Sequence, residues 1–156
     1  MEKLWSLPPL TKVIEAYGCL GDNRIVISDD SAKVYSSSRG KYYTVNYDSK
    51  ENTISSNDNV SFYVGYMGYP VVAFLMKKGL VKYKPEFTEA LAGFAWKDVN
   101  QTNNNNFAKT NEMALEMSEK RGYQRSEIEA DAKSVLAQIK KIKLLKAKSI
   151  RPPKGY

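Results

Sequence analysis

The hydrophobic pattern of residues 24–64 consists of short runs that favour β-strands, joined by connections of only a few residues. The runs cover residues 24–28, 33–35, 41–47, 53–54 and 60–64. The positions between them are rich in Asp, Asn, Ser and Gly, which favour tight turns. Connections this short join antiparallel neighbours, because a parallel pair needs a crossover of about a dozen residues or more. The segment therefore predicts a small antiparallel β-meander.

Helical periodicity flanks this meander on both sides. Before it, apolar residues recur at helical spacing from Leu10 to Tyr17, with Ser6 as the candidate N-cap and Gly18 at the end of the helix. After it, further helices are expected at residues 71–78, 85–92, 96–99 and 107–121. Four consecutive asparagines interrupt them and predict a loop. This order of elements is that of an α+β domain.

The last predicted helix is long and basic, and its beginning carries a clear local signal. Ser126 and Glu129 have the S-x-x-E spacing of a capping box. An apolar seam follows one face of the helix and consists of Ile128, Ala132, Val135, Ile139 and Ile142. The helix continues into a proline-containing segment that cannot remain helical. We expect one α+β domain over residues 1–148 and a basic, flexible tail over residues 149–156.

The chain has no histidine and a single cysteine, Cys19, among its 156 residues. Histidine is the usual general base near neutral pH and the commonest ligand of transition metals. A lone cysteine completes neither an intrachain disulfide nor a four-cysteine zinc site, so Cys19 is expected to be a buried apolar residue. The glycine-rich phosphate-binding motifs are also missing. We expect no catalytic residue, no metal and no cofactor, and we rank an enzyme behind the other classes of function.

The N-terminal region does not resemble a signal peptide. An acidic residue at position 2 and the prolines Pro8 and Pro9 interrupt the place where such a peptide has its apolar run. The longest apolar stretch, residues 71–76, is much shorter than the ~20 residues of a membrane-spanning helix. We expect a cytoplasmic protein without membrane contact.

Charge is distributed very unevenly along the sequence. All 17 acidic residues lie at or before Asp131, whereas eight of the 24 lysines and arginines lie after it. Residues 1–131 are therefore nearly neutral, with 16 basic against 17 acidic side chains, and the net charge of +7 arises from the C-terminal end. The eight basic residues are Lys133, Lys140, Lys141, Lys143, Lys146, Lys148, Arg151 and Lys154.

A basic helix and tail suit a polyanionic partner, because each phosphate that they neutralise releases counterions. Lysine outnumbers arginine seven to one among the eight residues, which favours phosphate contacts over base recognition. The leading hypothesis is a non-catalytic accessory protein that contacts nucleic acid, in particular RNA or a ribonucleoprotein. A solvated helix surface or an acidic protein partner explains the same lysines. The other class of function is a protein-interaction module, a subunit of a complex or an oligomer that uses the apolar seam. The seam is short for a coiled coil, and packing on its own domain is the favoured interpretation.

Seven of the eleven tyrosines fall within residues 35–69. Tyr42 and Tyr43 are adjacent in a predicted strand, so their side chains must point to opposite faces of the sheet. Both are candidates for stacking on nucleic-acid bases, with lysines interleaved around them. Tyrosine is also a good strand residue, and packing within the domain is the favoured interpretation.

Three stretches in the order 29–35, 75–79 and 120–123 resemble the N-terminal part of archaeal tRNA-splicing endonucleases. Their sequences are DDSAKVY, LMKKG and KRGY. The nuclease half of that family, including its histidine, has no counterpart in this chain. The resemblance therefore assigns no site residue and does not establish membership of that family.

Overall fold

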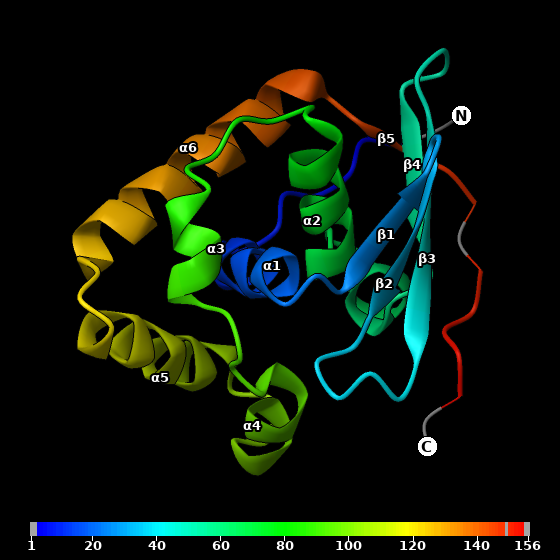
Figure 1. Ribbon diagram of the computed structural model, residues 1–156. Coiled ribbons are helices and arrows are strands. Elements are labelled where there is room, and N and C mark those ends of the chain that lie inside the picture. Colours follow the sequence, from blue (N-terminus) through cyan, green and yellow to red (C-terminus); the bar gives the residue numbers. More distant parts are fainter. Residues whose placement is uncertain (1–2, 149, 155–156) are drawn as a thin grey trace.

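The computed structural model describes residues 3–148 and 150–154, in which a sheet of five strands stands beside a group of helices (Figure 1). The strands are β1 (Ile25–Ser28), β2 (Ser31–Tyr35), β3 (Tyr42–Asp48), β4 (Thr53–Ser56) and β5 (Leu145–Lys146). The helices are α1 (Leu10–Gly21), η1 (Val60–Val64), α2 (Tyr69–Lys78), α3 (Glu86–Ala90), α4 (Trp96–Thr102), α5 (Phe107–Lys120) and α6 (Arg125–Ile142). This arrangement confirms the α+β class.

The strand order is β1-β2-β3-β4-β5, and β1 to β4 form the antiparallel meander that the sequence predicts. Asp29 and Asn52 adopt left-handed backbone conformations in two of its turns, with φ of 55° and 54°. Asp and Asn tolerate this conformation better than most residues. β5 is not predicted by the sequence pattern; it pairs parallel to β4 at the edge of the sheet.

The inner face of the sheet is covered by α2, which lies between the sheet and α1 (Figure 1). Residues 71–76 of α2 are all buried because apolar neighbours surround this helix on both sides. Ile25, Val34 and Ile54 line the inner face and are at most 7% exposed. Gly79 ends α2 with a φ of 85°, as the sequence predicts.

α1 is the central helix and contacts α2, α3, α5 and α6. It extends to Gly21, so the prediction that it ends at Gly18 is wrong. Gly18 is buried within the helix because the Trp96 indole packs against it, at a place where a Cβ would lie 2.5 Å from the indole nitrogen. The predicted Ser6 cap is also wrong: Pro9 is the N-cap residue, and Ser6 instead forms an isolated β-bridge with Tyr66.

The apolar seam of α6 packs on the domain itself. Ile128, Ala132, Val135 and Ile139 are at most 1% exposed, and Ile142 packs partly buried against the same core. The interpretation that the seam belongs to the core is therefore confirmed, and these side chains are not on the surface.

The capping box at the start of α6 is not formed. The N-cap residue is Gln124, no side chain caps the helix, and Ser126 is already its second residue. Arg125 begins the helix and binds Glu112 and Glu119 of α5 at 2.6 and 2.8 Å. These ion pairs fix the start of the helix one residue before Ser126.

Residues 60–64 form the π-helical turn η1 instead of the predicted fifth strand of the meander. The buried Asp58 carboxylate accepts hydrogen bonds from the Ser61 amide and hydroxyl at 3.0 and 2.7 Å, and from the Ser56 hydroxyl at 2.5 Å. This side-chain network competes with strand pairing and turns the chain into a helix. Gly65 then ends η1 with a φ of 98°.

α6 ends at Ile142, earlier than the predicted passage of the helix into the tail. Lys143 adopts a left-handed conformation with a φ of 54°, after which Leu144 enters the core and β5 begins. Residues 150–154 form no regular element, and residues 149, 155 and 156 of the predicted tail lie outside the described residues. No helix in the described part of the chain is long and apolar enough to cross a membrane.

The loop predicted at the asparagine run is confirmed. Asn104 and Asn105 have φ of 52° and 61°, which asparagine accommodates in turns. Asn106 is the N-cap of α5, and its side chain accepts a hydrogen bond from the Lys109 amide at 3.1 Å. The run thus positions the loop between α4 and α5.

Candidate functional site

The eight C-terminal basic residues divide into two groups along the chain. Lys133, Lys140 and Lys141 lie on the exposed side of α6, and we call them the helix lysines. The remaining five lie in the extended segment after α6, which runs along the edge of the sheet in the direction of β4 (Figure 1). We call these the segment cations: Lys143, Lys146, Lys148, Arg151 and Lys154.

None of these eight residues takes part in an ion pair within residues 3–148 and 150–154. The ion pairs found there are Lys12–Glu15, Arg24–Asp22, Lys78–Asp30, Arg125–Glu112 and Arg125–Glu119. Seven of the eight side chains are exposed, and Lys146 is half-buried with its Nζ 4.8 Å from the centre of the Trp5 ring. The positive charge at this end of the chain is therefore not neutralised by ion pairs with described carboxylates.

Tyr42 and Tyr43 lie on opposite faces of β3, as the alternation requires. Tyr43 is 7% exposed on the inner face, with its ring centre 5.3 Å from the Nζ of Lys41. Tyr42 is 44% exposed on the outer face, with its ring centre 5.7 Å from that of Tyr35 and 5.1 Å from the Nζ of Lys33. The structure therefore separates the two stacking candidates and leaves only Tyr42 open to solvent.

The outer face around Tyr42 is hollowed into a groove of about 430 Å³, lined among others by Val26, Lys33 and Asn46. β5 is two strands away from β3 in the sheet order. Tyr42 also lies at the opposite end of β3 from Asp48, whose partner Thr53 pairs with β5. The first segment cations and Tyr42 are therefore separated along the sheet by about 20 Å, the length of a strand of six residues.

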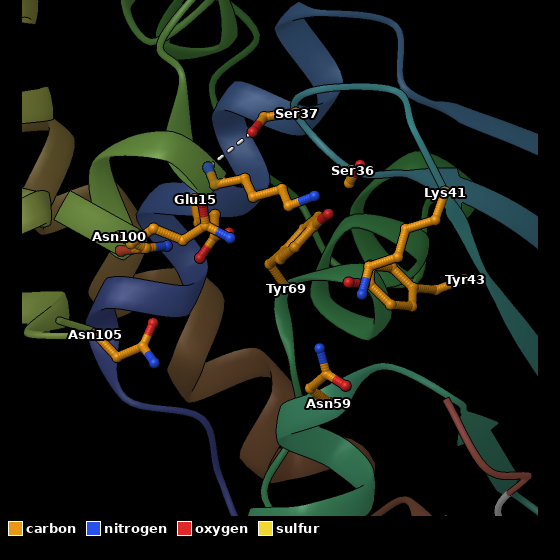
Figure 2. Close-up of a pocket in the computed structure, with 11 residues that line it drawn as sticks. Glu15, Ser36, Ser37, Lys41, Tyr43, Asn59, Tyr69, Asn100 and Asn105 are labelled. Carbon is orange, nitrogen blue, oxygen red and sulfur yellow. Dashed lines mark hydrogen bonds between the residues drawn. The ribbon is translucent and has the colours of Figure 1, made fainter. Parts of the chain in front are cut away.

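A second site, which we call the polar pocket, lies between α1, α4 and the chain around β3 (Figure 2). It has a volume of about 300 Å³. Its walls come from six parts of the fold and contain almost only polar side chains. The lining residues are Glu15, Ser36, Ser37, Lys41, Tyr43, Asn59, Tyr69, Lys97, Asn100, Gln101 and Asn105.

Glu15 is the acidic residue of the polar pocket, and it is 6% exposed. The hydrogen bond that it accepts within the described residues comes from the Lys12 ammonium at 3.4 Å. Lys12 is itself buried, with its Nζ 3.6 Å from the centre of the Phe107 ring. Burial raises the pKa of the Glu15 carboxyl above its ordinary value, and the charges of Lys12 and Arg24 oppose this shift.

Arg24 lies behind the pocket and is 1% exposed. Its guanidinium donates hydrogen bonds to the Tyr35 carbonyl at 2.8 Å, the Tyr69 hydroxyl at 3.4 Å and the Asp22 carboxylate at 3.3 Å. Its Nη2 atom is buried and has no hydrogen-bond partner in the described part of the chain. Burial also raises the pKa of Tyr69 well above its usual value, against the influence of Arg24, so Tyr69 presents a neutral hydroxyl.

The sequence pattern did not identify the polar pocket, because its residues come from distant parts of the chain. One signal is present in the printed sequence: Lys12 and Glu15 are the only charged residues of α1 and stand three positions apart on one face. A charged pair in an otherwise apolar helix indicates that a polar site faces it. Among residues 3–148 and 150–154, no cluster of three or more Cys, Asp or Glu side chains is placed to hold a metal ion.

Comparison with known proteins places the chain in a family. Searches of curated proteins and of solved structures found no match. Residues 5–145 match the family described as "Uncharacterised conserved protein UCP014422". The match covers α1, the whole meander, the helices, the beginning of β5 and all residues that line the polar pocket. Four of the eight C-terminal basic residues lie beyond it: Lys146, Lys148, Arg151 and Lys154. The chain belongs to this family.

Proposed function

We propose that the protein is a non-catalytic accessory protein of the cytoplasm that contacts nucleic acid, RNA or a ribonucleoprotein in particular, through its C-terminal basic residues. The observation that supports this proposal is the set of eight cations without an ion pair among the described residues. Their charge remains available to phosphates, and nearly all of the side chains are exposed.

The division of the basic residues into helix lysines and segment cations suits a flexible nucleic-acid strand better than a rigid duplex. The helix lysines span residues 133–141 of α6, about 12 Å of helix at 1.5 Å per residue. The segment cations then follow an extended course beside the sheet. A single strand that bends around the end of α6 contacts both groups in turn. We therefore expect single-stranded RNA to bind more tightly than a short, rigid DNA duplex.

Because lysine is the commonest basic residue in both groups, we expect the protein to contact phosphates and not to read the base sequence. Lysine presents a compact charge without the planar fork that arginine offers to guanine or to a phosphate pair. Contacts of this kind carry little sequence information, and their strength falls steeply with salt. We expect similar affinities for RNA strands of different sequence and equal length.

The test uses substitutions, because a truncation after Asp131 would remove Val135, Ile139 and Leu144 from the core. In the first variant, the helix lysines Lys133, Lys140 and Lys141 are changed to Gln. In the matched control, the exposed lysines Lys50, Lys109 and Lys120 are changed to Gln, which alters net charge equally. Circular dichroism checks that both variants are folded, and fluorescence anisotropy measures binding of a labelled single-stranded RNA.

The helix variant should bind RNA at least tenfold more weakly than the control. Its plot of log affinity against log salt should be shallower by about 2, since three contacts to a single strand contribute about 0.7 each. A second variant with Lys148, Arg151 and Lys154 changed to Gln reports on the segment cations in the same way. Equal affinities for all variants and the control would show that these residues do not bind RNA.

A further inference from the structure

The polar pocket combines features that an ordinary surface hollow lacks. Its volume of about 300 Å³ is at the lower end of the range for small-molecule sites, about 300–1,000 Å³. Glu15 reaches it from the central helix α1, and side chains from six separate parts of the chain converge on it (Figure 2). A site of this size accommodates a small polar molecule rather than a macromolecule.

Two polar atoms of the pocket wall are poorly satisfied by the protein. Glu15 accepts one long hydrogen bond within the described residues, although a carboxylate has room for about four. The Oδ1 atom of Asn100 is buried and has no hydrogen-bond partner in the same part of the chain. A buried acceptor without a donor is unfavourable, because it has lost its hydrogen bonds to water. Glu15 and Asn100 both line the pocket, and the side-chain oxygens of both can accept hydrogen bonds from a donor such as a hydroxyl group.

The charge around the pocket is positive despite Glu15. Lys41 and Lys97 line it, whereas the buried Lys12 and Arg24 behind its wall are paired with Glu15 and Asp22 at 3.4 and 3.3 Å. Glu15 is the lining carboxylate. The combination of several cations with a carboxylate fits a ligand that carries an anionic group at one end and hydrogen-bond donors at the other.

The remaining lining groups indicate what the donors are. Asn59, Gln101 and Asn105 offer amides, which both donate and accept, and Ser36 and Ser37 contribute hydroxyls. Such a set matches the alternating donors and acceptors of a sugar. Tyr43 and Tyr69 supply the aromatic part of the wall.

We propose that the polar pocket binds a phosphorylated sugar, either free or as the sugar phosphate of a nucleotide. Lys41 and Lys97 attract the phosphate, and Glu15 and Asn100 accept hydrogen bonds from the sugar hydroxyls. The site is independent of the C-terminal cations and of the proposed contact with nucleic acid, because none of the eight basic residues lines it.

The test measures binding of ribose 5-phosphate to the full chain by isothermal titration calorimetry and by NMR shifts of assigned backbone amides. Saturable binding should perturb the amides of residues 36–43 and 97–101. Free ribose and inorganic phosphate should each bind at least tenfold more weakly, because each lacks one half of the interaction. Adenosine 5′-monophosphate distinguishes the two sources: tighter binding identifies a nucleotide, and equal or weaker binding identifies a free sugar phosphate.

Substitutions of the lining residues test whether the ligand binds in the polar pocket. Glu15→Gln and Lys41→Gln should each weaken binding tenfold or more, whereas Lys50→Gln, in an exposed turn, should leave it unchanged. Gln101→Glu is a second variant on an exposed part of the rim, where folding is not at risk and the new charge repels phosphate. The proposal is overturned if neither ribose 5-phosphate nor the mononucleotide saturates by about 10 mM, a very weak dissociation constant. It is also overturned if the NMR shift changes fall mainly on the C-terminal basic residues. The same conclusion follows if Gln101→Glu binds ribose 5-phosphate as tightly as the wild type does.

Discussion

The hydroxyl of Tyr17 in α1 donates a hydrogen bond to the carboxylate of Asp131 in α6, and this bond joins the central helix to the last helix. Asp131 also accepts a hydrogen bond from the Lys84 amide at 3.1 Å. Two partners thus hold the half-buried side chain of the last acidic residue of the sequence in place. The neighbouring lysines of α6 have no such partner among the described carboxylates.

Tyr17→Phe removes this hydrogen bond without changing the size of the ring. We expect the free energy of unfolding to fall by about 2 kcal/mol, the usual contribution of a hydrogen bond to a charged group. Urea denaturation monitored by circular dichroism measures the difference. Tyr63→Phe is the matched control, because Tyr63 is 69% exposed, and its stability should equal that of the wild type. Equal stability of both variants would contradict the role of the bond.

Gly18→Ala tests the close packing of Trp96 on α1. Alanine usually stabilises a helix interior by up to about 1 kcal/mol relative to glycine. Here a Cβ would lie 2.5 Å from Trp96 Nε1 and 3.1 Å from the Leu91 carbonyl oxygen. We expect a loss of about 1–3 kcal/mol instead, which is typical of an overpacked core.

A double-mutant cycle provides the control for this substitution. Combining Gly18→Ala with Trp96→Phe removes the clashing indole nitrogen. The double variant should therefore lose less unfolding free energy than the sum of the losses in the two single variants. A stabilising effect of Gly18→Ala alone would show that the helix and the indole are not packed as described.

Glu15→Gln should change how stability depends on pH. The pKa of Glu15 is raised in the folded protein, so the native state binds its proton more tightly than the unfolded chain does. The contribution of this group is complete below the unfolded pKa and is lost as the pH rises through the raised folded pKa. The stability of the variant relative to the wild type should therefore increase from about pH 4 towards neutrality. Denaturation midpoints at several pH values measure it.

The attraction of Lys12 acts on the ionised form of Glu15 and is therefore already contained in the net shift of the Glu15 pKa. Any change in packing that the Gln side chain introduces adds an offset that does not depend on pH. The test is therefore how the difference in unfolding free energy between Glu15→Gln and the wild type changes with pH, and not the sign of that difference at one pH. Glu51→Gln, in an exposed turn, is the control that removes one carboxylate from the surface, and the slope for Glu15→Gln should be the steeper of the two. A flat difference for Glu15→Gln would contradict the raised pKa.

Cys19 should be inert in the native protein. It is fully buried, and burial raises the pKa of its thiol to about 12, so almost no thiolate exists at neutral pH. We expect a disulfide-exchange reagent such as Ellman's reagent to react only after denaturation. The same protein in concentrated urea is the control and should release one equivalent. Rapid reaction of the native protein would show that α1 is not covered by its neighbours.

Local signals predicted most of the fold. The alternating residues of β1 to β4 and the Asp and Asn turns determine the meander, and Pro70 and Gly79 delimit α2. These features can be predicted from the sequence because each depends on residues that are close together in it. The burial of Cys19 and of the α6 seam follows from the same local patterns.

The errors arise where a specific side-chain or tertiary contact overrides the preference that composition and spacing indicate. Residues 60–64 have the composition of a strand, but the Asp58 network turns them into η1. Ser126 has the spacing of a cap, but ion pairs from Arg125 to α5 set the start of α6. β5 exists because Leu145 and Lys146 meet β4. None of these partners is adjacent in sequence.

The candidate sites show the same contrast. The C-terminal cations are evident from the sequence because they all lie within residues 133–154, where no acidic residue occurs. The polar pocket is not, because Glu15, Lys41 and Asn100 come together only when α1, β3 and α4 are in place. The sequence also presents Tyr42 and Tyr43 as equivalent, whereas the covering of the inner face by α2 distinguishes them.

Residues 3–5, before α1, are hydrogen-bonded to residues 144–146, after α6. The Trp5 amide donates to the Leu144 carbonyl at 2.9 Å, and the Lys146 amide donates to the Lys3 carbonyl at 2.7 Å. α1 is likewise enclosed only when α6 is present. During synthesis, the first helix must therefore remain incompletely covered until residues 125–146 have left the ribosome. A nascent chain stalled before that point exposes apolar surface that chaperones recognise, and completion of the fold is a late, cooperative event.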